Sequence, residues 1–463
     1  MAAVSVRDNI YRMKRTVLLL GAFFVMAFPA SVHAGEPMTV RDCMEYALSN
    51  STKMRIQAAD RRDEQLSRRD AILRAFTPSV GGSTSFSGNF GRSIDPETNT
   101  YISTRSVSNG YSASASITLF DGFAAVNNVR ISATNARLGA SKERQAEDAI
   151  CLATLEAFCN AVYYTELCGI VGDQVATLEE TLRAVRKQEE LGQKGHTDVV
   201  QAEADLASKQ YTLISTRNLR DNALMSLKDV MFYPADEELE IDMDVEKGMR
   251  TLLAGNAADI ADFARGSDPS VVIARGNMDN ARLNLSTARW QLAPSLSLSG
   301  GVSSSYFNYP GKNGYQAPPF RTQLRSNLGE YVGISLSIPI YSRLSARSQI
   351  SRMKNALERA SAEYDRVQRE VENEVYRAVG DRDGAGAAFM QAEKLAGVQE
   401  EAYRLSLRQF GLGLISGIEF QTVSGRYLEA KASCLDARLK YCIKNAVVRH
   451  YNGESYIDQW TDR

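Results

Sequence analysis

The stretch SITLFD at residues 116–121 recurs as SIPIYS at residues 337–342. The same offset aligns Gly192 with Gly413, and it holds for roughly eighty residues without an insertion, as in tandem structural repeats. Two unrelated helical hairpins of similar composition would not keep one register over this distance. The sequence therefore predicts a twofold internal repeat. Each copy contains a helix, two strands, a long helix, a tight turn and another helix.

Four short segments alternate apolar residues with serine or glycine. They cover residues 79–90, 111–119, 295–303 and 332–340. A period of two is typical of a β-strand, and about 9–12 residues is the length of a strand that spans a membrane. We expect the apolar side of these strands to face lipid and the serine side to face a water-filled bore. The alternative is a pair of soluble hairpins with one buried face.

Four strands in one chain form an open sheet. In hydrocarbon, the unpaired N–H and C=O groups at an open edge cost several kcal/mol each. Strands that span a membrane must therefore pair with strands of other chains. Two chains would give eight strands, whose interior fills with side chains, whereas three chains would give twelve and leave a bore. The sequence predicts a trimeric 12-stranded transmembrane β-barrel, with exposed loops at residues 91–109 and 308–329.

Two very long helices are predicted, one in each copy. No proline occurs from Phe123 to about Leu191, and apolar residues recur there at steps of three and four, as in a coiled coil. At a rise of 1.5 Å per residue this helix would be about 105 Å long. The second copy repeats the pattern from Leu344 to about Gln409. Within it, the segment GDRDGAG at residues 380–386 predicts a kink or local unwinding, because each glycine weakens a helix by roughly 1 kcal/mol.

The N-terminus has the layout of a secretory signal peptide. Three basic residues at positions 12–15 precede an apolar run at residues 17–28, and a small-residue cleavage site follows. This apolar run is too short to span a bilayer as a helix, which needs about 20 residues. We expect residues 1–34 to be a signal peptide whose translation begins at Met1 or at Met13. No other stretch of the sequence has a long enough apolar run for a transmembrane helix, so membrane insertion is expected to use strands.

Composition argues against several classes of function. Basic and acidic residues balance, 54 against 55, which removes the electrostatic case for nucleic-acid binding. The chain contains three histidines and no recognisable nucleophile, metal or phosphate motif. We therefore expect neither an enzyme nor a metal or cofactor site. The six cysteines match no zinc or redox spacing, and we expect buried free thiols, with disulfides as the alternative. They are Cys43, Cys151, Cys159, Cys168, Cys434 and Cys442.

The turn between the paired helices carries the most specific motif. It reads QEELGQKGHTDVV at residues 188–200 and QFGLGLISGIEF at residues 409–420. Together with the signal peptide, the repeat and the serine-rich strands, this motif resembles the TolC family of outer-membrane efflux proteins over essentially the whole chain after residue 34. The resemblance implies an α+β membrane protein. Its long antiparallel coiled-coil hairpins would form a periplasmic tube that continues the barrel, with a belt around the tube.

This resemblance also divides the chain into segments. The first repeat is expected at residues 35–230 and the second at residues 269–450. Residues 231–268 and the C-terminal tail at residues 451–463 match no long-helix pattern, so we expect them to form the connecting, equatorial belt.

The family places a ring of three carboxylates at the closed periplasmic mouth. By that analogy Glu419 is assigned to the gate, and Asp198 is its counterpart in the first copy. Both acids have a structural alternative, because an acid in the first turn stabilises a helix. In the first copy, Thr197 is the expected N-cap residue of that helix.

One departure from the family concerns the latch of the gate. The family has an arginine two residues after the second glycine, where this chain has Ile415. We expect apolar packing of Leu412, Leu414 and Ile415 to hold the gate closed instead. As exposed apolar residues they also suit docking of a periplasmic adaptor. The residues assigned to adaptor docking are Gly192, Gly195, Gly411, Gly413, Leu412 and Leu414.

The resemblance predicts a trimeric exit duct in the outer membrane of a Gram-negative cell. Small molecules would pass through it passively from a periplasmic adaptor and an inner-membrane pump of the RND or ABC type. Two alternatives remain, namely the outer-membrane component of type I protein secretion and a periplasmic coiled-coil protein without a pore. The partners implied are two further copies of the chain, the adaptor, the pump and outer-membrane lipid, with no nucleic acid.

Overall fold

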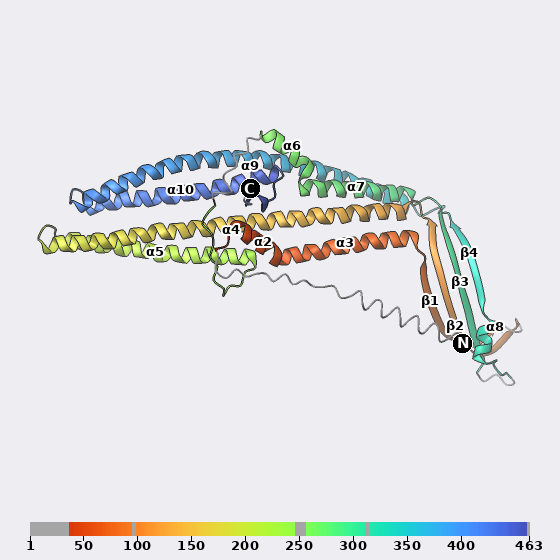
Figure 1. The fold of residues 1–463 in the computed structure, drawn as a ribbon. Helices are drawn as coiled ribbons and strands as arrows, with labels where there is room; N and C mark the ends of the chain where they lie inside the picture. The colour runs from red at the N-terminus through yellow and green to blue at the C-terminus, as the bar shows by residue number, and fades with distance from the viewer. Residues whose placement is uncertain (1–36, 95–98, 246–255, 311–314, 461–463) are drawn as a thin grey trace, which may run out of the picture.

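The molecule is elongated, and a bundle of long helices continues at one end into a narrow β-sheet (Figure 1). The computed structural model describes residues 37–94, 99–245, 256–310 and 315–460. The expected signal peptide at residues 1–34 lies outside the described residues. No helix in the described part of the chain is long and apolar enough to cross a membrane.

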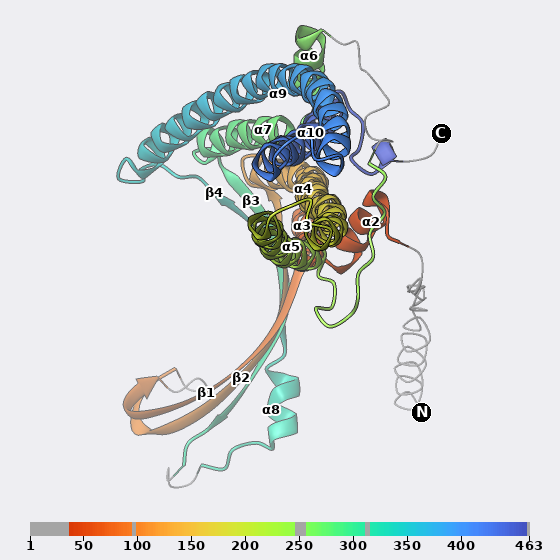
Figure 2. The same ribbon diagram turned by 90° about the vertical axis from the view of Figure 1, so that its left-hand side faces the viewer.

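The sheet contains the four expected strands, arranged as an antiparallel meander in the order β1-β2-β3-β4. Their bounds are β1 Ser79–Ile94, β2 Tyr101–Phe120, β3 Ser295–Asn308 and β4 Gly329–Ser337. Because each strand pairs with its neighbour in sequence, β1 and β4 form the two edges of the sheet. Figure 2 shows the strands running together away from the helices in a curved ribbon.

The strand ends differ from those predicted. Residues 91–109 were expected to form a loop, but β1 and β2 pair through most of this segment, as far as Ile94 opposite Tyr101. The loop expected at residues 308–329 contains the short helix α8, Phe320–Ser326. The fourth strand ends at Ser337 and does not reach residue 340. Pro339 accounts for this early end, since proline has no N–H to donate to a strand ladder.

The pairing register brings the serines of different strands together on one face of the sheet. Ser112 of β2 lies opposite Ser303 of β3, and Ser299 lies opposite Gly333 of β4. Three serine pairs join β1 to β2 through their hydroxyl oxygens. These pairs are Ser79–Ser116 at 3.0 Å, Ser83–Ser112 at 2.7 Å and Ser87–Ser108 at 2.6 Å. Side chains alternate between the two faces of a strand, so the apolar residues share the opposite face.

The predicted twofold repeat is confirmed by the bounds of the long helices. The first hairpin consists of α4, Ala124–Glu190, and α5, His196–Met231. The second consists of α9, Ser345–Gly411, and α10, Gly417–Tyr451. Both bounds of α9 follow the matching bounds of α4 at the same offset that relates Gly413 to Gly192. At 67 residues each, α4 and α9 are about 100 Å long.

The local unwinding expected at residues 380–386 does not occur, because α9 is helical from Ser345 to Gly411. Packing against α10 supports the helix at Gly386 and beside Gly380. A Cβ added at Gly386 would lie 3.1 Å from the ring of Tyr441, and Lys444 donates to Asp381 over 2.8 Å. Tertiary contacts of this kind override intrinsic helix propensity. The helix follows a gentle curve over its whole length (Figure 1).

Shorter helices flank the hairpins. α3, Thr52–Phe76, packs along α4, and α7, Pro269–Trp290, packs along α9. α2, Val40–Asn50, precedes α3, and α6, Ala257–Ser267, precedes α7. α6 lies within residues 231–268, the segment that was expected to form the connecting, equatorial belt. Seen from the end of the bundle, α4 and α5 form one pair and α9 and α10 form the other (Figure 2).

The largest apolar core lies where the first hairpin, α2 and α10 meet. Phe158 and Leu155 of α4 and Met44 of α2 are fully buried there, and Trp460 of the C-terminal tail packs against the same cluster. Five of the six cysteines are buried, and Cys434 is half-buried, which confirms the expected burial. Burial raises the pKa of Cys43 to about 12, so this thiol is protonated at neutral pH.

Candidate functional site

Both hairpin turns are built on a glycine with left-handed backbone geometry. Gly192 has φ of 69° and Gly413 has φ of 73°. The N–H of Gln193 donates to the carbonyl oxygen of Gln188 over 2.8 Å, and that of Leu414 donates to Gln409 over 2.9 Å. These are the six-to-one bonds that close the C-terminus of a helix when a glycine adopts this conformation. The same local chemistry therefore places the two tips at equivalent positions in the repeat.

Asp198 and Glu419 both cap the helix that follows the turn. Oδ2 of Asp198 accepts from the N–H of Gly195 over 3.1 Å. Oε2 of Glu419 accepts from the N–H of Ser416 over 2.9 Å, and the Ser416 hydroxyl accepts from the N–H of Glu419 over 3.2 Å. The structural alternative for both acids is therefore present. Thr197 was expected to be the N-cap residue, but Gly195 occupies that position.

The apolar residues of the second tip separate into two groups. Leu412 and Leu414 are 75% and 70% exposed. Ile415 is half-buried and packs against the cluster formed at the tips by Phe410 and Phe420 with residues of the first hairpin. The expectation that all three are exposed is therefore wrong for Ile415. Its side chain contributes to the fold of the tip itself.

Contacts between the two tips use residues that the sequence did not reveal. Nε2 of Gln421 donates to Oδ1 of Asp205 over 2.8 Å, linking α10 to α5. Nζ of Lys194, in the first turn, lies 4.5 Å from the ring centre of Phe410, within range of a cation–π interaction. The chain has Ile415 where the family has an arginine, and these two contacts join the tips without it. None of them follows from a local sequence pattern, because the partners come from different hairpins.

A cavity of about 180 Å³ lies between the two tips. Asp198, Asp205 and Lys194 line its first-hairpin side, and Ser416 and Ile418 line the other. Two carboxylates and one amine thus line the space between the two hairpins. Within the described residues, no group of three or more metal-ligating side chains occurs.

Stacked aromatic rings stiffen the second tip. Phe410 stacks on Phe420 with ring centres 5.0 Å apart, and Tyr403 stacks on Tyr427 at 4.8 Å. Burial raises the pKa of Tyr403, so its phenol stays neutral in the physiological range. The first hairpin has Leu182 at the position that matches Tyr403. The turns of the two tips therefore have the same backbone geometry, but the helices next to each turn pack differently.

Long helical hairpins with matched tips, joined to a sheet of membrane-length strands, define a class of channel-forming outer-membrane protein. A sequence model of the family described as "Outer membrane efflux protein" matches residues 44–231 and 261–454. Because these two segments make up most of the chain, the protein belongs to this family, and it is an outer-membrane protein.

Individual relatives are similar at low identity. The chain is 23% identical over 304 residues to the outer membrane efflux protein BepC of Brucella suis, a match that covers 61% of this chain and 60% of BepC. It is 20% identical to the alkaline protease secretion protein AprF of Pseudomonas aeruginosa, over 72% of this chain and 67% of AprF. The crystal structure of VceC from Vibrio cholerae superimposes with a TM-score of 0.73 at 14% identity. That match covers 90% of this chain and 96% of VceC.

Proposed function

We propose that three copies of this chain form a passive exit duct for small molecules across the outer membrane. The observation that carries this proposal is the four-stranded sheet, which has two unpaired edges and an apolar face that nothing in the described chain covers. Val80, Phe90 and Val332 of that face are 77%, 79% and 84% exposed. Lipid is the solvent that suits such a face, and closure with neighbouring copies satisfies the edges.

The serine face supports a water-filled bore. Ser112 and Ser303 lie opposite each other on that face, and small neutral hydroxyls present no barrier to polar solutes. The helical hairpins would continue the bore into the periplasm. The chain would supply no energy and catalyse no reaction, because its family is one of efflux channels.

The tips are the surface proposed to meet the rest of an export system. Leu412, Leu414 and Ile418 are 75%, 70% and 68% exposed there, and clustered exposed apolar side chains are typical of interaction sites. A periplasmic adaptor docked at this surface would connect the duct to an inner-membrane pump. The glycines of the two turns give the tips the compact shape such docking needs.

Glu419 is proposed to control the periplasmic mouth. Its side chain is exposed, and only Oε2 is engaged in the contacts to Ser416. In a trimer, three such carboxylates would converge and repel one another, and they would bind cations that relieve the repulsion. The residue thus combines a capping role with a charge that three copies bring together.

Single-channel conductance in a planar bilayer tests this function. Purified protein is expected to form ion-conducting pores, and Glu419→Gln is expected to increase conductance and weaken block by divalent cations. Ser416→Ala is the matched control, because it removes a hydrogen bond of the same cap and keeps the carboxylate. Absence of pores from correctly folded protein would contradict the duct. If divalent cations block the wild type and Glu419→Gln equally, Glu419 is not part of the gate.

Protein secretion is the second candidate, and the similarity to AprF, a protease secretion protein, favours it. A strain that lacks the gene distinguishes the two. Loss of an efflux duct would increase sensitivity to small toxic compounds, whereas loss of a secretion duct would remove specific proteins from the culture medium. A periplasmic coiled-coil protein without a pore would leave no heat-resistant trimer in membrane extracts.

A further inference from the structure

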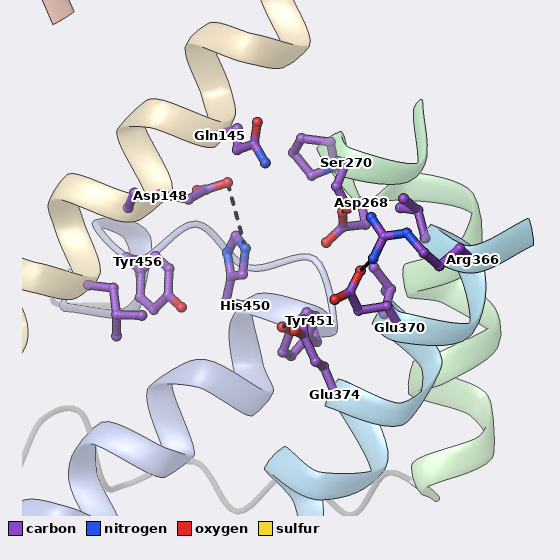
Figure 3. Close-up of a pocket in the computed structure, with 15 residues that line it drawn as sticks. Gln145, Asp148, Asp268, Ser270, Arg366, Glu370, Glu374, His450, Tyr451 and Tyr456 are labelled. Carbon is purple, nitrogen blue, oxygen red and sulfur yellow. Dashed lines mark hydrogen bonds and ion pairs between the residues drawn. The ribbon is translucent and has the colours of Figure 1, made fainter. Parts of the chain in front are cut away.

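A second cavity, of about 420 Å³, lies at the middle of the molecule, away from the tips. Figure 3 shows its polar walls. α4 provides Asp148 and Gln145, α9 provides Arg366, Glu370 and Glu374, and the end of α10 provides His450. The cavity is thus lined by both copies of the repeat, with α4 from the first and α9 and α10 from the second.

His450 and Asp148 form an ion pair across this boundary. His450 Nε2 lies 3.6 Å from Asp148 Oδ2, and the two side chains are only 15% and 19% exposed. The imidazole ring stacks on Tyr456 with ring centres 4.5 Å apart and planes 12° from parallel. Its other nitrogen, Nδ1, is buried and has no hydrogen-bond partner among the described residues. The ring is therefore held by packing against Tyr456. Its polar contact across the boundary is with Asp148, which belongs to the first repeat of the same chain.

The remaining charged groups of the cavity wall are engaged elsewhere. Arg366 pairs with Glu363 and Glu370 on its own helix. Asp268 accepts from the N–H of Ser270 over 2.8 Å at the start of α7, and the Tyr451 hydroxyl donates to Glu374 over 3.1 Å. Because these polar groups already have partners within the chain, the cavity is not prepared for a ligand.

Among the groups facing this pair, only the imidazole ordinarily changes charge between pH 5 and 8. Burial raises the pKa of Asp148, an effect that the charges of His450 and Arg144 oppose and that of Asp268 reinforces. Burial also raises the pKa of both Tyr451 and Tyr456, so these phenols stay neutral. On α4, burial raises the pKa of the Cys151 thiol to about 12.

We propose that His450 and Asp148 form a proton-operated latch between the two copies of the repeat. Protonated His450 attracts the carboxylate of Asp148 and holds the end of α10 against α4. Loss of the proton as the pH rises removes that attraction and leaves the half-buried carboxylate with the charge of Arg144, whose effect on Asp148 is smaller than that of His450, and weaker compensation of a partly buried charge is unfavourable. The latch is therefore tight at mildly acidic pH and loose above neutral pH. At still lower pH, protonation of Asp148 also releases it.

A consequence for the gate rests on the proposed function. The two tips lie on separate hairpins, so any widening of the mouth between them moves α4 and α5 relative to α9 and α10. A loose latch would make that movement easier. The duct is therefore expected to open more often at about pH 7.5 than at about pH 6, the interval over which histidines lose their charge.

Hydrogen exchange of the purified full-length protein tests the latch without reference to conduction. After correction for the intrinsic effect of pH, peptides containing Asp148 and His450 should exchange about fivefold to tenfold faster at pH 7.5 than at pH 6, because the contact between α10 and α4 opens more easily. His450→Gln should exchange fast at both values. His196→Gln is the matched control, because His196 is exposed at the tip, where it contacts Glu189, and this variant should keep the wild-type profile.

Asp148→Asn changes the other member of the ion pair, and it replaces His450→Gln as the test variant if that protein does not fold. Asp148→Asn should also abolish the pH dependence of hydrogen exchange. Identical pH profiles for wild type and either latch variant would overturn the proposal. A pH-dependent exchange profile in a protein that never conducts would uphold the latch and contradict the proposed duct, so the two failures are distinguishable.

Discussion

Single residues at the tips serve the fold and the proposed gate together. Glu419 bonds to Ser416 through Oε2, and Asp198 bonds to Gly195 in the same way in the first copy. A carboxylate three residues after the N-cap satisfies a backbone N–H that the helix itself leaves unpaired. Removing such an acid therefore weakens the helix start as well as the local charge. A gating experiment needs the Ser416→Ala control for this reason.

The turn glycines allow a prediction at the scale of the residue. Gly413→Ala should destabilise the second tip by about 1–2 kcal/mol, because a residue with a Cβ is strained at positive φ. Trypsin cleavage after Arg408, which requires the end of α9 to unfold, should become roughly tenfold faster. Gly411→Ala is the control, since Gly411 is the last residue of α9 and an added Cβ there meets nothing within 4 Å. Equal cleavage of the two variants would show that the left-handed turn does not limit tip stability.

At the scale of the element, the pairing register of the strands places serines on one face of the sheet and apolar residues on the other. A shift of one residue between strands would move every serine to the other face. The pairs Ser83–Ser112 and Ser87–Ser108, whose hydroxyls lie 2.7 Å and 2.6 Å apart, help to fix that register. The face that carries them is therefore continuous from β1 to β4.

This register predicts which positions water reaches in the membrane. A water-soluble, membrane-impermeant thiol reagent should modify Ser112→Cys, on the serine face, and should leave Ala113→Cys unmodified in intact membranes. Ala113 is the next residue of β2 and lies on the apolar face. The two variants therefore differ only in the face of the sheet toward which the cysteine points. After detergent solubilisation both should react. Equal reactivity of the two variants in membranes would contradict the assignment of the bore to the serine face.

At the scale of the whole molecule, the described residues of one chain leave a large apolar surface and two strand edges uncovered. Ile334 of β4 and Phe86 of β1 are 70% and 73% exposed. No residue within α3 is buried, although this helix runs along α4. Such surfaces are typical of a protomer that becomes complete only in an assembly or in lipid.

The proposed trimer predicts cross-links that one chain cannot form by itself. β1 and β4 are at opposite edges of the sheet, so a disulfide between Ser83→Cys and a cysteine in β4 must join two subunits. We expect at least one of Tyr331→Cys, Gly333→Cys and Ser335→Cys, which share the serine face, to give linked dimers and trimers on a denaturing gel. Ser83→Cys combined with a cysteine in β3 should give none. Failure of every β4 position would exclude closure through these edges.

Local periodicity explains how much the sequence could predict. Period-two alternation located all four strands, and apolar steps of three and four located α4 and α9. Gly192 and Gly413 marked both turns because few other residues tolerate that backbone geometry. The constant offset between the two copies then related the halves of the chain. Each of these signals depends only on residues that are close in the chain or on a comparison of one copy with the other.

Only the tertiary structure decided how distant segments meet. It lengthened β1 and β2, kept α9 helical through residues 380–386, and packed Ile415 into the tip. It also brought Gln421 to Asp205, and His450 to Asp148. The physical reason is the same in each case, since the stability of a contact between two helices or strands depends on which faces their packing presents, and no local pattern encodes that choice.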